Sequence, residues 1–380
     1  MRMSMISAAL VAALVGFGAS VSIVLAAAQA LGATPAQTAS WLAAVSIAKG
    51  LGMILLSGWT RVPVVLAWST PGAALIATTS GIGMNEAVGA FLFAALLIVL
   101  TALLPPIRRA VSAIPDGVAA AMLAGVLLPF CMAAARYAGT DPAFALPIIA
   151  MFLAMRLIQP LTAALAALAL GLILGFALSP AQPPAFDIAL NPFVFVLPEV
   201  SVPVLLGLGL PLYLVTMASQ NLPGFAVLRA NGYEPPVGRA LGVTGLGSAL
   251  SALFGAHTHS MAAITAAICL GPDVHPDKDE RWKVGLIQGV IWIALGFLGP
   301  YFTSVMLALP ASIIGTVAGL ALILPFLGAV QTAFTPEHTR FAAAVTLITT
   351  ASGVAAFGIG AAFWGLVAGV VITLADRLRR

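Results

Sequence analysis

The sequence predicts an all-α integral membrane protein of about fourteen transmembrane segments, arranged as two inverted repeats of seven segments each. Three observations predict this fold: the composition, the number of apolar runs, and a similarity between the two halves of the chain. Of the 380 residues, 61% are hydrophobic and 7% are charged, whereas soluble domains average about 25% charged residues. A soluble protein could not cover its surface with so few polar groups, but a bilayer removes that need.

The apolar runs are separated by Pro, Gly or charged residues, and about 20 residues suffice to span the hydrocarbon as a helix. The first run follows Arg2, but it is too long for the apolar part of a signal peptide. We therefore expect it to be the first membrane helix. The third and tenth runs are irregular. The fourteen runs lie at 5–31, 37–57, 62–79, 84–104, 116–135, 144–158, 161–179, 202–222, 237–254, 259–271, 283–305, 311–329, 340–356 and 359–375.

The basic residues predict the orientation. With the N-terminus in the cytoplasm and the chain alternating across the segments, all of the 16 Lys and Arg residues except Arg136 and Lys49 fall in cytoplasmic regions, as the positive-inside rule requires. We therefore expect a multi-pass protein of a bacterial-type cytoplasmic (inner) membrane, with both termini cytoplasmic. The basic residues form no stripe, so the net charge of +4 does not indicate nucleic-acid binding. The cytoplasmic set is Arg2, Arg61, Arg108, Arg109, Arg156, Arg229, Arg239, Lys278, Arg281, Lys283, Arg340, Arg377, Arg379 and Arg380.

The two halves of the chain resemble each other. Residues 11–32 align with 202–223, so that Gly16 meets Gly207 and Gln29 meets Gln220. A second pair of stretches aligns in the same order at nearly the same offset. Because each repeat holds an odd number of segments, the second enters the membrane from the opposite side and is inverted. We expect the first repeat at 1–178, an external linker at 179–201 and the second repeat at 202–380.

The third segment predicts a broken span. Its first half, 62–68, is β-branched and aromatic and is too short to cross as a helix. Ser69 and Thr70 then precede Pro71, which is typical of a helix start because a hydroxyl caps free N–H groups and Pro fits the first turn. We expect a short strand followed by a half-helix that begins at mid-depth. The alternative is a simple kink.

The tenth segment holds the equivalent place in the second repeat. Thr258, His259 and Ser260 offer the cap, so two half-helix N-termini would face each other near the bilayer centre. Their N–H donors and partial positive charges predict a site for an anion or an acceptor-rich ligand. His257 and His259 would point to the same side of an extended stretch and line one wall. The alternative is a pair of neutral histidines in the core.

Three further polar residues within the apolar runs are candidates. Gln220 and Asn221 end the eighth segment, where they face a cavity or make a structural hydrogen bond. Lys49 lies within a helix, where it snorkels, caps carbonyl groups or acts as a counter-ion to a carboxylate.

The sequence gives no sign of a metal or cofactor site. Cys131 and Cys269 lie in apolar runs and are typical of small buried residues. Asp116 is expected to cap its helix near the cytoplasmic end. Because no buried carboxylate pair or HExxH spacing appears, we expect a protein that is not an enzyme.

Three long strings carry a resemblance to a known family. They are WSTPGAALIA at 68–77, SQNLPGFAVLRANGY at 219–233 and GAHTHSMAAITAAICLG at 255–271. Along nearly its whole length the chain resembles the benzoate:proton symporters, the BenE family, which is similar to the wider uracil-transporter-like group. That fold has seven-plus-seven segments, with short strands and half-helices in segments three and ten.

The resemblance implies two domains. Segments 1–4 and 8–11 form a core domain, at 1–104 and 202–299, and the other segments form a gate domain, at 105–178 and 300–380. It also suggests a homodimer through the gate domain. The uracil-transporter-like group often uses glutamates in segments eight and ten, where this chain has Gln220 and His257-Thr258-His259. This departure argues against nucleobase recognition by carboxylates.

These observations lead to one hypothesis, in which the protein imports benzoate or a close aromatic carboxylate together with protons, by alternating access. The carboxylate meets the half-helix N-termini, and His257 or His259 carries the proton because histidine titrates near roughly pH 6.5. The alternatives are transport of another small anion or nucleobase, or a passive channel. The candidate substrate-binding residues are Phe17, Ser69, Thr70, Gly72, Gln220, Asn221, His257, Thr258, His259, Ser260, Met261 and Phe326, with Lys49 as a counter-ion.

Overall fold

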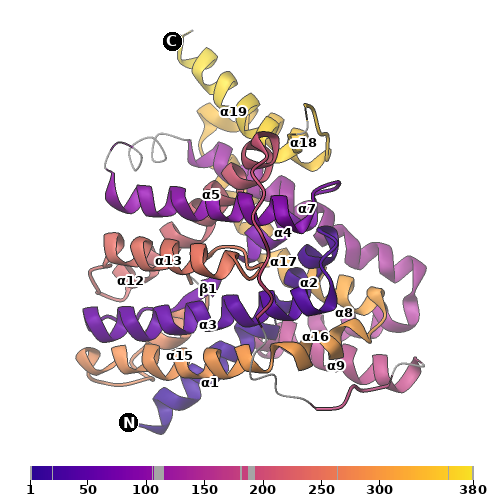
Figure 1. Ribbon diagram of the computed structural model, residues 1–380, viewed down its shortest axis with the longest axis vertical. Coiled ribbons are helices and arrows are strands. Elements are labelled where there is room, and N and C mark those ends of the chain that lie inside the picture. The colour runs from indigo at the N-terminus through magenta and orange to yellow at the C-terminus, as the bar shows by residue number, and fades with distance from the viewer. Residues whose placement is uncertain are drawn as a thin grey trace.

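The computed structural model describes residues 2–18, 20–104, 106, 115–179, 182–186, 193–262, 264–357 and 359–378. Figure 1 shows a helical molecule in which many long helices lie roughly parallel to one another. Part of the predicted linker, 180–181 and 187–192, lies outside the described residues, as do Arg108, Arg109, Arg379 and Arg380 from the orientation argument.

The first repeat contains eight α-helices and one strand among the described residues. In chain order they are α1 (Met3–Gly18), α2 (Val21–Ala30), α3 (Pro35–Thr60), β1 (Leu66–Trp68), α4 (Thr70–Ala77), α5 (Met84–Leu103), α7 (Asp116–Thr140), α8 (Pro142–Ile158) and, after a short turn η1 (Pro160–Thr162), α9 (Ala163–Leu178).

The second repeat begins with a helix of mixed pitch. That helix consists of α10 (Val202–Val204), η2 (Leu205–Gly209), α11 (Leu210–Thr216), η3 (Met217–Asn221) and α12 (Leu222–Ala230). The remaining elements are α13 (Val237–Ala252), β2 (His259–Met261), α14 (Ile264–Leu270), η4 (Lys278–Glu280), α15 (Trp282–Phe297), α16 (Gly299–Leu307), α17 (Ala311–Phe334), η5 (Glu337–Thr339), α18 (Arg340–Ala351) and α19 (Ala361–Leu378).

These elements account for all fourteen predicted runs. Among the described residues, six helices are long and apolar enough to cross a membrane unaided, or seven if α15 and α16, which meet at a bend of 57°, count as one. Pro300, near the start of α16, explains that bend because it lacks an N–H group. The other runs are shorter helices or strand-plus-helix segments.

The first run is one apolar span, Met3–Ala30, as the sequence predicted, but its helix is not regular throughout. The chain breaks between α1 and α2, and Ser20 lies at the break with its Oγ donating to the Gly16 carbonyl at 2.7 Å. In a regular helix the Gly16 carbonyl would accept from the backbone N–H of residue 20. Here it accepts from the Ser20 hydroxyl, so the backbone at Ser20 can leave the helical conformation. The break places Ser20 beside the centre of the molecule.

The eighth run also departs from a regular helix, in a way that the sequence analysis did not anticipate. Two π-helical turns, η2 and η3, interrupt it. Pro211 and Pro223 each follow one of these turns by two residues. Because proline cannot donate the usual hydrogen bond to the preceding turn, the widened turn accommodates the missing bond.

The predicted strands are present in segments three and ten, and they pair with each other. β1 and β2 are antiparallel, with Leu66 opposite Met261 and Trp68 opposite His259. The Ser69 N–H donates to the Thr258 carbonyl at 2.9 Å, which extends the pairing into the half-helix α4. The pairing satisfies backbone groups that would otherwise be unbonded in the hydrocarbon.

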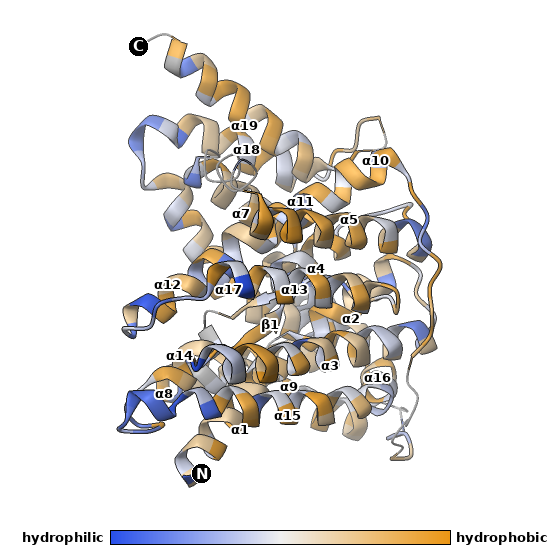
Figure 2. Cartoon of the chain, turned by 60° about the vertical axis from the view of Figure 1, so that its left-hand side comes forward, coloured by the Kyte–Doolittle hydropathy of each residue, from blue (hydrophilic) through white to orange (hydrophobic). Residues whose placement is uncertain are grey.

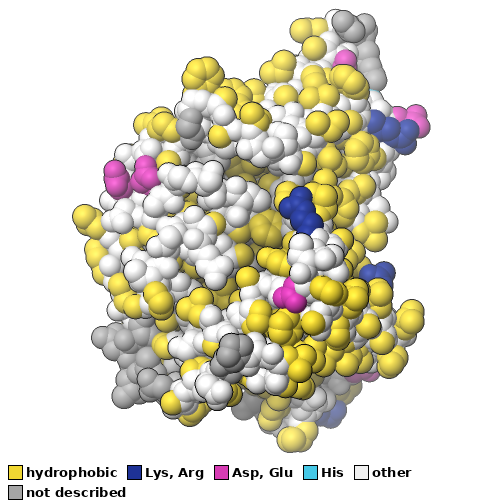
Figure 3. Space-filling view, turned by 90° about the vertical axis from the view of Figure 1, so that its right-hand side faces the viewer, with side chains coloured by type: hydrophobic (Ala, Val, Ile, Leu, Met, Phe, Trp, Pro, Cys, Tyr) yellow, Lys and Arg dark blue, Asp and Glu magenta, His cyan; other side chains and the backbone are white. Residues whose placement is uncertain are grey.

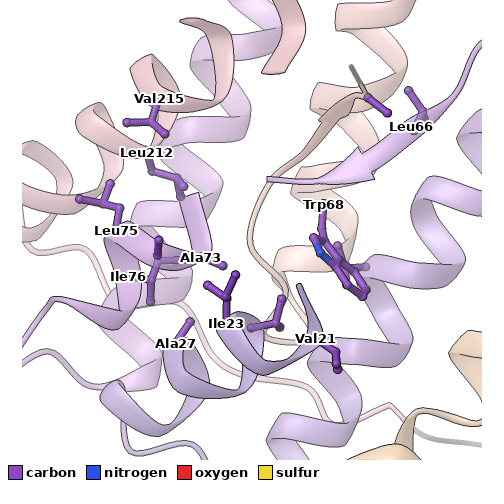
Figure 4. Close-up of a cluster of buried hydrophobic side chains, with 14 of the residues drawn as sticks. Val21, Ile23, Ala27, Leu66, Trp68, Ala73, Leu75, Ile76, Leu212 and Val215 are labelled. Atoms are coloured by element: carbon purple, nitrogen blue, oxygen red, sulfur yellow. The ribbon is translucent and has the colours of Figure 1, made fainter. Parts of the chain in front are cut away.

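The half-helix α4 packs against α2 in a dry cluster (Figure 4). Ile23 and Ala27 of α2 lie close to Ala73 and Ile76 of α4, and all four are fully buried. Trp68 of β1 stands beside the first turn of α2, near Val21. The small side chains of Ala27 and Ala73 therefore let the two short helices approach each other. Their contact fixes the start of α4 next to the paired strands β1 and β2 and the residues that flank them, which we call the strand crossing.

Long helices from both repeats form a layer around the strands. Figure 1 shows α5, α13, α3 and α15 side by side, and each is in contact with the next. The order alternates between the repeats: α3 of the first packs on α13 and α15 of the second, and α13 packs on α5. Such alternation of helices from the two repeats is expected for inverted repeats that are related by an axis between β1 and β2.

A second group of helices packs around α7 and α17, which lie against each other. Each of these two helices carries a proline inside, Pro129 and Pro325. α8 and α9 pack on α17, while α18 and α19 pack on α7. The division into core and gate domains at 104 and 299 stays a prediction.

The outer surface is suited to lipid. In Figure 2 the strongly hydrophilic residues gather in the connections between helices, and in Figure 3 hydrophobic side chains are spread over much of the visible face, with few charged ones. On α3 the large hydrophobic side chains that are exposed are Leu51, Leu55 and Trp59, four residues apart. This spacing puts an apolar stripe on one face of the helix.

The contact between α3 and α15 depends on two facing glycines. A Cβ atom on Gly50 would lie 2.7 Å from the Gly289 carbonyl oxygen. We expect Gly50→Ala to push these helices apart and to destabilise the protein by about 1–3 kcal/mol, measured as a lower thermal unfolding midpoint in detergent. Gly58→Ala is the control, because its Cβ would meet no atom closer than 3.9 Å. Equal midpoints for the two variants would contradict the expectation.

Candidate functional site

The strand crossing is held by a chain of buried hydroxyl groups. Ser69 caps α4, since its Oγ accepts from the Gly72 N–H at 3.2 Å, and the same oxygen accepts from Thr216 Oγ1 at 3.0 Å. Thr216 Oγ1 also lies 2.9 Å from Thr258 Oγ1. These bonds join segments three, eight and ten at one point. Ser69, Gly72 and Thr258 therefore lie close together, and the hydrogen-bonding groups named here already have protein partners.

His257 is buried and hydrogen-bonded through both ring nitrogens. Trp41 Nε1 donates to its Nδ1 at 2.9 Å, and its Nε2 lies 3.1 Å from the Ser69 carbonyl, which can only accept. These partners assign the neutral ring with the proton on Nε2. A second proton would have to displace the Trp41 bond, so the geometry favours a structural role for His257.

His259 points toward α13. Its Nδ1 lies 3.3 Å from Ser248 Oγ, and its Nε2 is buried without a hydrogen-bond partner among the described residues. The ring packs on the backbone of α13, where a Cβ atom on Gly247 would lie 2.8 Å from Nε2. The two histidines therefore do not share one wall of a cavity: His257 bonds to α3 and α4, and His259 packs on α13.

Asn221 ties the end of the eighth segment to β2. Its Oδ1 accepts from the Met261 N–H at 3.0 Å, and its Nδ2 lies 3.3 Å from Met217 Sδ. Because these bonds occupy the amide, the geometry favours the structural alternative that the sequence left open for Asn221. The neighbouring Gln220 lines a cavity.

A cavity of about 680 Å³ lies beside the strand crossing. One wall comes from α7 and α17, and the others come from α1, β1, α4, the eighth segment and α15. Its deep end is formed by buried Ser20, Lys49, Trp68 and Trp292. Its shallow end has exposed residues: Asp116, Leu222, Ala226, Gly328 and Thr332. The cavity therefore opens where α7 and α12 meet the end of α17.

Lys49 is the ionisable group at the deep end. Its side chain is 1% exposed, and its Nζ lies 3.0 Å from the ring centroid of Trp292 and 3.7 Å from that of Trp68. Such cation–π contacts stabilise an ammonium group by roughly 0.5–2 kcal/mol. The ion pairs found among the described residues are Lys283–Glu280 and Arg340–Glu337, so Lys49 has no carboxylate partner there.

An aromatic cluster closes the deep end, and it consists of Phe17, Trp68, Trp292 and Phe302. Phe17 contacts the other three, with ring centroids 4.7 to 6.3 Å apart. Trp68 is fixed by a hydrogen bond from Nε1 to Ser20 Oγ of 2.6 Å. Phe17 therefore supports the cavity from behind the two tryptophans.

The sequence-predicted site residues fall into two groups. Thr70, Gln220 and Lys49 line the cavity. The other candidates are not among the lining residues: Phe17, Ser69, Gly72, Asn221, His257, Thr258, His259, Ser260, Met261 and Phe326. Most of the second group builds the strand crossing behind the cavity. Their role as substrate-binding residues stays a prediction.

Sequence reasoning missed several lining residues, among them Ser20, Trp68, Trp292 and Thr265. Trp68 stood within the string that carried the family resemblance, but its ring was not recognised as part of the deep end. The broken first helix would have pointed to Ser20, had the break been predicted. Asp116, expected as a helix cap, also lines the shallow end.

The fold and the cavity, together with the family match, define a membrane transport protein. The family described as "Benzoate membrane transport protein" matches residues 1–374. The chain belongs to this family, as the resemblance indicated.

Two relatives match along nearly the whole chain. The inner membrane protein YdcO of Escherichia coli (strain K12) is 41% identical over 98% of this chain and 97% of its own length. The benzoate membrane transport protein of Acinetobacter baylyi (strain ATCC 33305 / BD413 / ADP1) is 32% identical over 96% of this chain and 93% of its own length. Together with the apolar helices, these matches support a multi-pass inner membrane protein.

Solved structures share the fold. The transmembrane domain of the cyanobacterial bicarbonate transporter BicA matches with a TM-score of 0.61 at 14% identity, over 99% of this chain and 97% of that chain. SLC26A9 matches with a TM-score of 0.55 at 12% identity, over 90% of this chain and 64% of that chain. The predicted inverted-repeat fold is confirmed as that of BicA and SLC26A9. The predicted likeness to uracil transporters stays a prediction.

The two bonds of His257 give a test of its structural role. We expect His257→Ala to lower the free energy of unfolding, because Trp41 Nε1 and the Ser69 carbonyl each lose a buried partner at about 1–3 kcal/mol. Thermal unfolding in detergent measures the effect, with His338→Ala on the exposed turn η5 as the control. Trp41→Phe should be non-additive with His257→Ala, because the two share one bond. Full additivity would contradict the pairing.

Proposed function

We propose that the protein carries benzoate or a closely related aromatic carboxylate across the membrane together with protons, by alternating access. The observation that carries this proposal is the cavity, which combines mostly apolar walls with one buried lysine side chain. Its volume of about 680 Å³ falls among those of pockets that hold small organic ligands, roughly 300–1,000 Å³. A benzoate ion offers a flat apolar ring for the walls and one carboxylate for Lys49.

The comparisons support the substrate class. The matching family and the Acinetobacter relative are both named for benzoate transport. The likeness to BicA and SLC26A9 supports the fold alone, since the identities are 14% and 12%. The family and the Acinetobacter relative are named as membrane transport proteins, which supports the expectation that the chain is not an enzyme.

The positions of the basic residues suggest which way the cavity faces. Its shallow end lies beside Asp116 and Ala226, near the connection that follows Arg229 at the end of α12 and the one that precedes Arg340 at the start of α18. By the positive-inside rule these connections are cytoplasmic, with both termini on the same side. We therefore assign an inward-open state to this structure.

The packing suggests how the cavity changes sides. Residues from α7 and α17 line one wall, and these helices belong to the group with α8, α9, α18 and α19. We propose that this group is the gate domain and that it moves against the core domain around Lys49. The family resemblance is the support for a homodimer through the same helices.

Two alternatives belong to other classes of substrate or mechanism. A single buried lysine also suits another small anion, so bicarbonate and sulfate are competitors to include. Uracil stands for the nucleobases, the other substrate class left open. A passive channel would equalise substrate concentrations and would never exceed them. The closed deep end at the aromatic cluster favours a transporter over a continuous pore.

Uptake by purified protein tests the proposal. We expect labelled benzoate to enter proteoliposomes at an initial rate several-fold higher with an inward proton gradient than without one. Rates must be taken above those of protein-free liposomes, because the neutral acid crosses lipid unaided. Unlabelled benzoate should suppress the uptake, while benzamide, which lacks the carboxylate, should not.

Three results would contradict the proposal in different ways. No protein-dependent uptake by folded protein would remove benzoate as the substrate. Suppression by bicarbonate or uracil, but not by benzoate, would assign another substrate to the same fold. A protein-dependent rate that ignores the proton gradient would exclude proton coupling.

A further inference from the structure

At the deep end of the cavity, a protonated Lys49 would carry a buried positive charge with no negative charge beside it in the part of the chain that the structure describes. Lys49 is 1% exposed and has no carboxylate partner among the described residues. Burying a charge without a counter-charge costs more free energy than two cation–π contacts return. The rings of Trp68 and Trp292 therefore do not replace an anion. An ammonium group at this place is stable when a carboxylate binds beside it.

The hydroxyl at the deep end cannot supply the missing charge. Ser20 Oγ accepts from Trp68 Nε1 at 2.6 Å and donates to the Gly16 carbonyl at 2.7 Å. Both of its functions are used within the protein. Asp116 lies at the exposed shallow end of the same cavity, while Lys49 is buried at the deep end, and no ion pair joins them.

The other titratable groups on the elements around Lys49 have contacts of their own elsewhere in the protein. On the elements packed against α3, Arg239 of α13 stacks on Trp59, and Lys283 of α15 pairs with Glu280. His257 has two hydrogen bonds, and His259 packs on α13. The ring of Tyr301 of α16 contacts the rings of Phe302 and Phe186. Among the described residues that line the deep end of the cavity, Lys49 is the titratable one.

We propose that Lys49 binds the carboxylate of the substrate and is also the carrier of the co-transported proton. The inference rests on the proposed function and deepens it. In the empty site the Nζ is a neutral amine. It takes one proton from water in the cavity as the carboxylate arrives, and the resulting ion pair is neutral overall. After the gate moves, the carboxylate leaves and Nζ returns the proton to water on the other side.

The choice of lysine over arginine fits this cycle. A lysine amine gives up and regains its proton when buried, whereas an arginine guanidinium stays protonated in proteins. Transport of one proton with each carboxylate moves no net charge. Lys49 thereby replaces His257 and His259 as the proton carrier, and it explains why both histidines can be fixed in the strand crossing.

The experiment measures how the membrane potential affects benzoate uptake at equal pH on both sides. Potassium gradients with valinomycin set the potential, and initial rates are taken above those of protein-free liposomes. For the unaltered protein we expect rates that are the same, within about 1.5-fold, at inside-positive and inside-negative potential. This arm needs no variant. A potential-dependent rate in the unaltered protein would overturn the proposal.

The variants separate binding from proton transfer. Lys49→Arg keeps a charge that cannot leave, so benzoate exchange should persist within about tenfold, the proton gradient should no longer accelerate uptake, and inside-positive potential should now do so. Lys49→Met should reduce exchange by at least about 100-fold. Lys283→Arg, the same change outside the cavity, should behave like the unaltered protein, and the proton gradient should still accelerate uptake by His259→Gln.

The contrary outcomes are distinct. Gradient-driven uptake retained in Lys49→Arg, full exchange in Lys49→Met, or loss of proton coupling in His259→Gln would each overturn the role of Lys49 and leave benzoate transport intact. Failure of the unaltered protein to exchange benzoate at all would instead remove the proposed function.

Discussion

The pairing of β1 with β2 is the interaction on which the rest of this structure depends. An extended stretch in the hydrocarbon leaves backbone N–H and C=O groups without water, and each unbonded group costs several kcal/mol. Here the two extended stretches satisfy each other, from the Ala262 N–H bonded to the Val65 carbonyl through to Ser69 and Thr258. One strand comes from each repeat. The pairing therefore fixes the two halves of the chain to a common centre.

What surrounds the strands follows from this requirement. The half-helix α4 can begin at mid-depth because Ser69 caps it and Thr216 holds that cap. Trp41 and His257 secure the carbonyl of the same serine from the other side. Several of the polar side chains that the sequence suggested as ligand contacts are thus hydrogen-bonded to one another within the strand crossing. The cavity is left with hydroxyls at its edges, aromatic rings at its deep end and a single buried lysine.

The sequence predicted the fold well because hydropathy, proline positions and basic residues report on lipid and topology directly. The broken third and tenth segments were predicted from Ser69, Thr70 and Pro71 and from the symmetry of the repeats. The site was predicted only in part. Which way a side chain points depends on breaks such as the one at Ser20 and on the π turns at 205–209 and 217–221, and no simple periodicity reveals these. Hence Lys49 was recognised as a candidate, whereas its tryptophan neighbours were not.

The π turn at 217–221 has a geometric consequence for the helix that contains it. Such a turn holds one residue more than an α-helical turn, and a single residue rotates a helix by about 100°. It lets Gln220 face the cavity while Asn221, next in the chain, bonds to β2. The wide turn rotates the part of segment eight that follows it about the helix axis, relative to the part that precedes it. Removing one residue there would restore the regular pitch and turn α12 away from the cavity that it now borders.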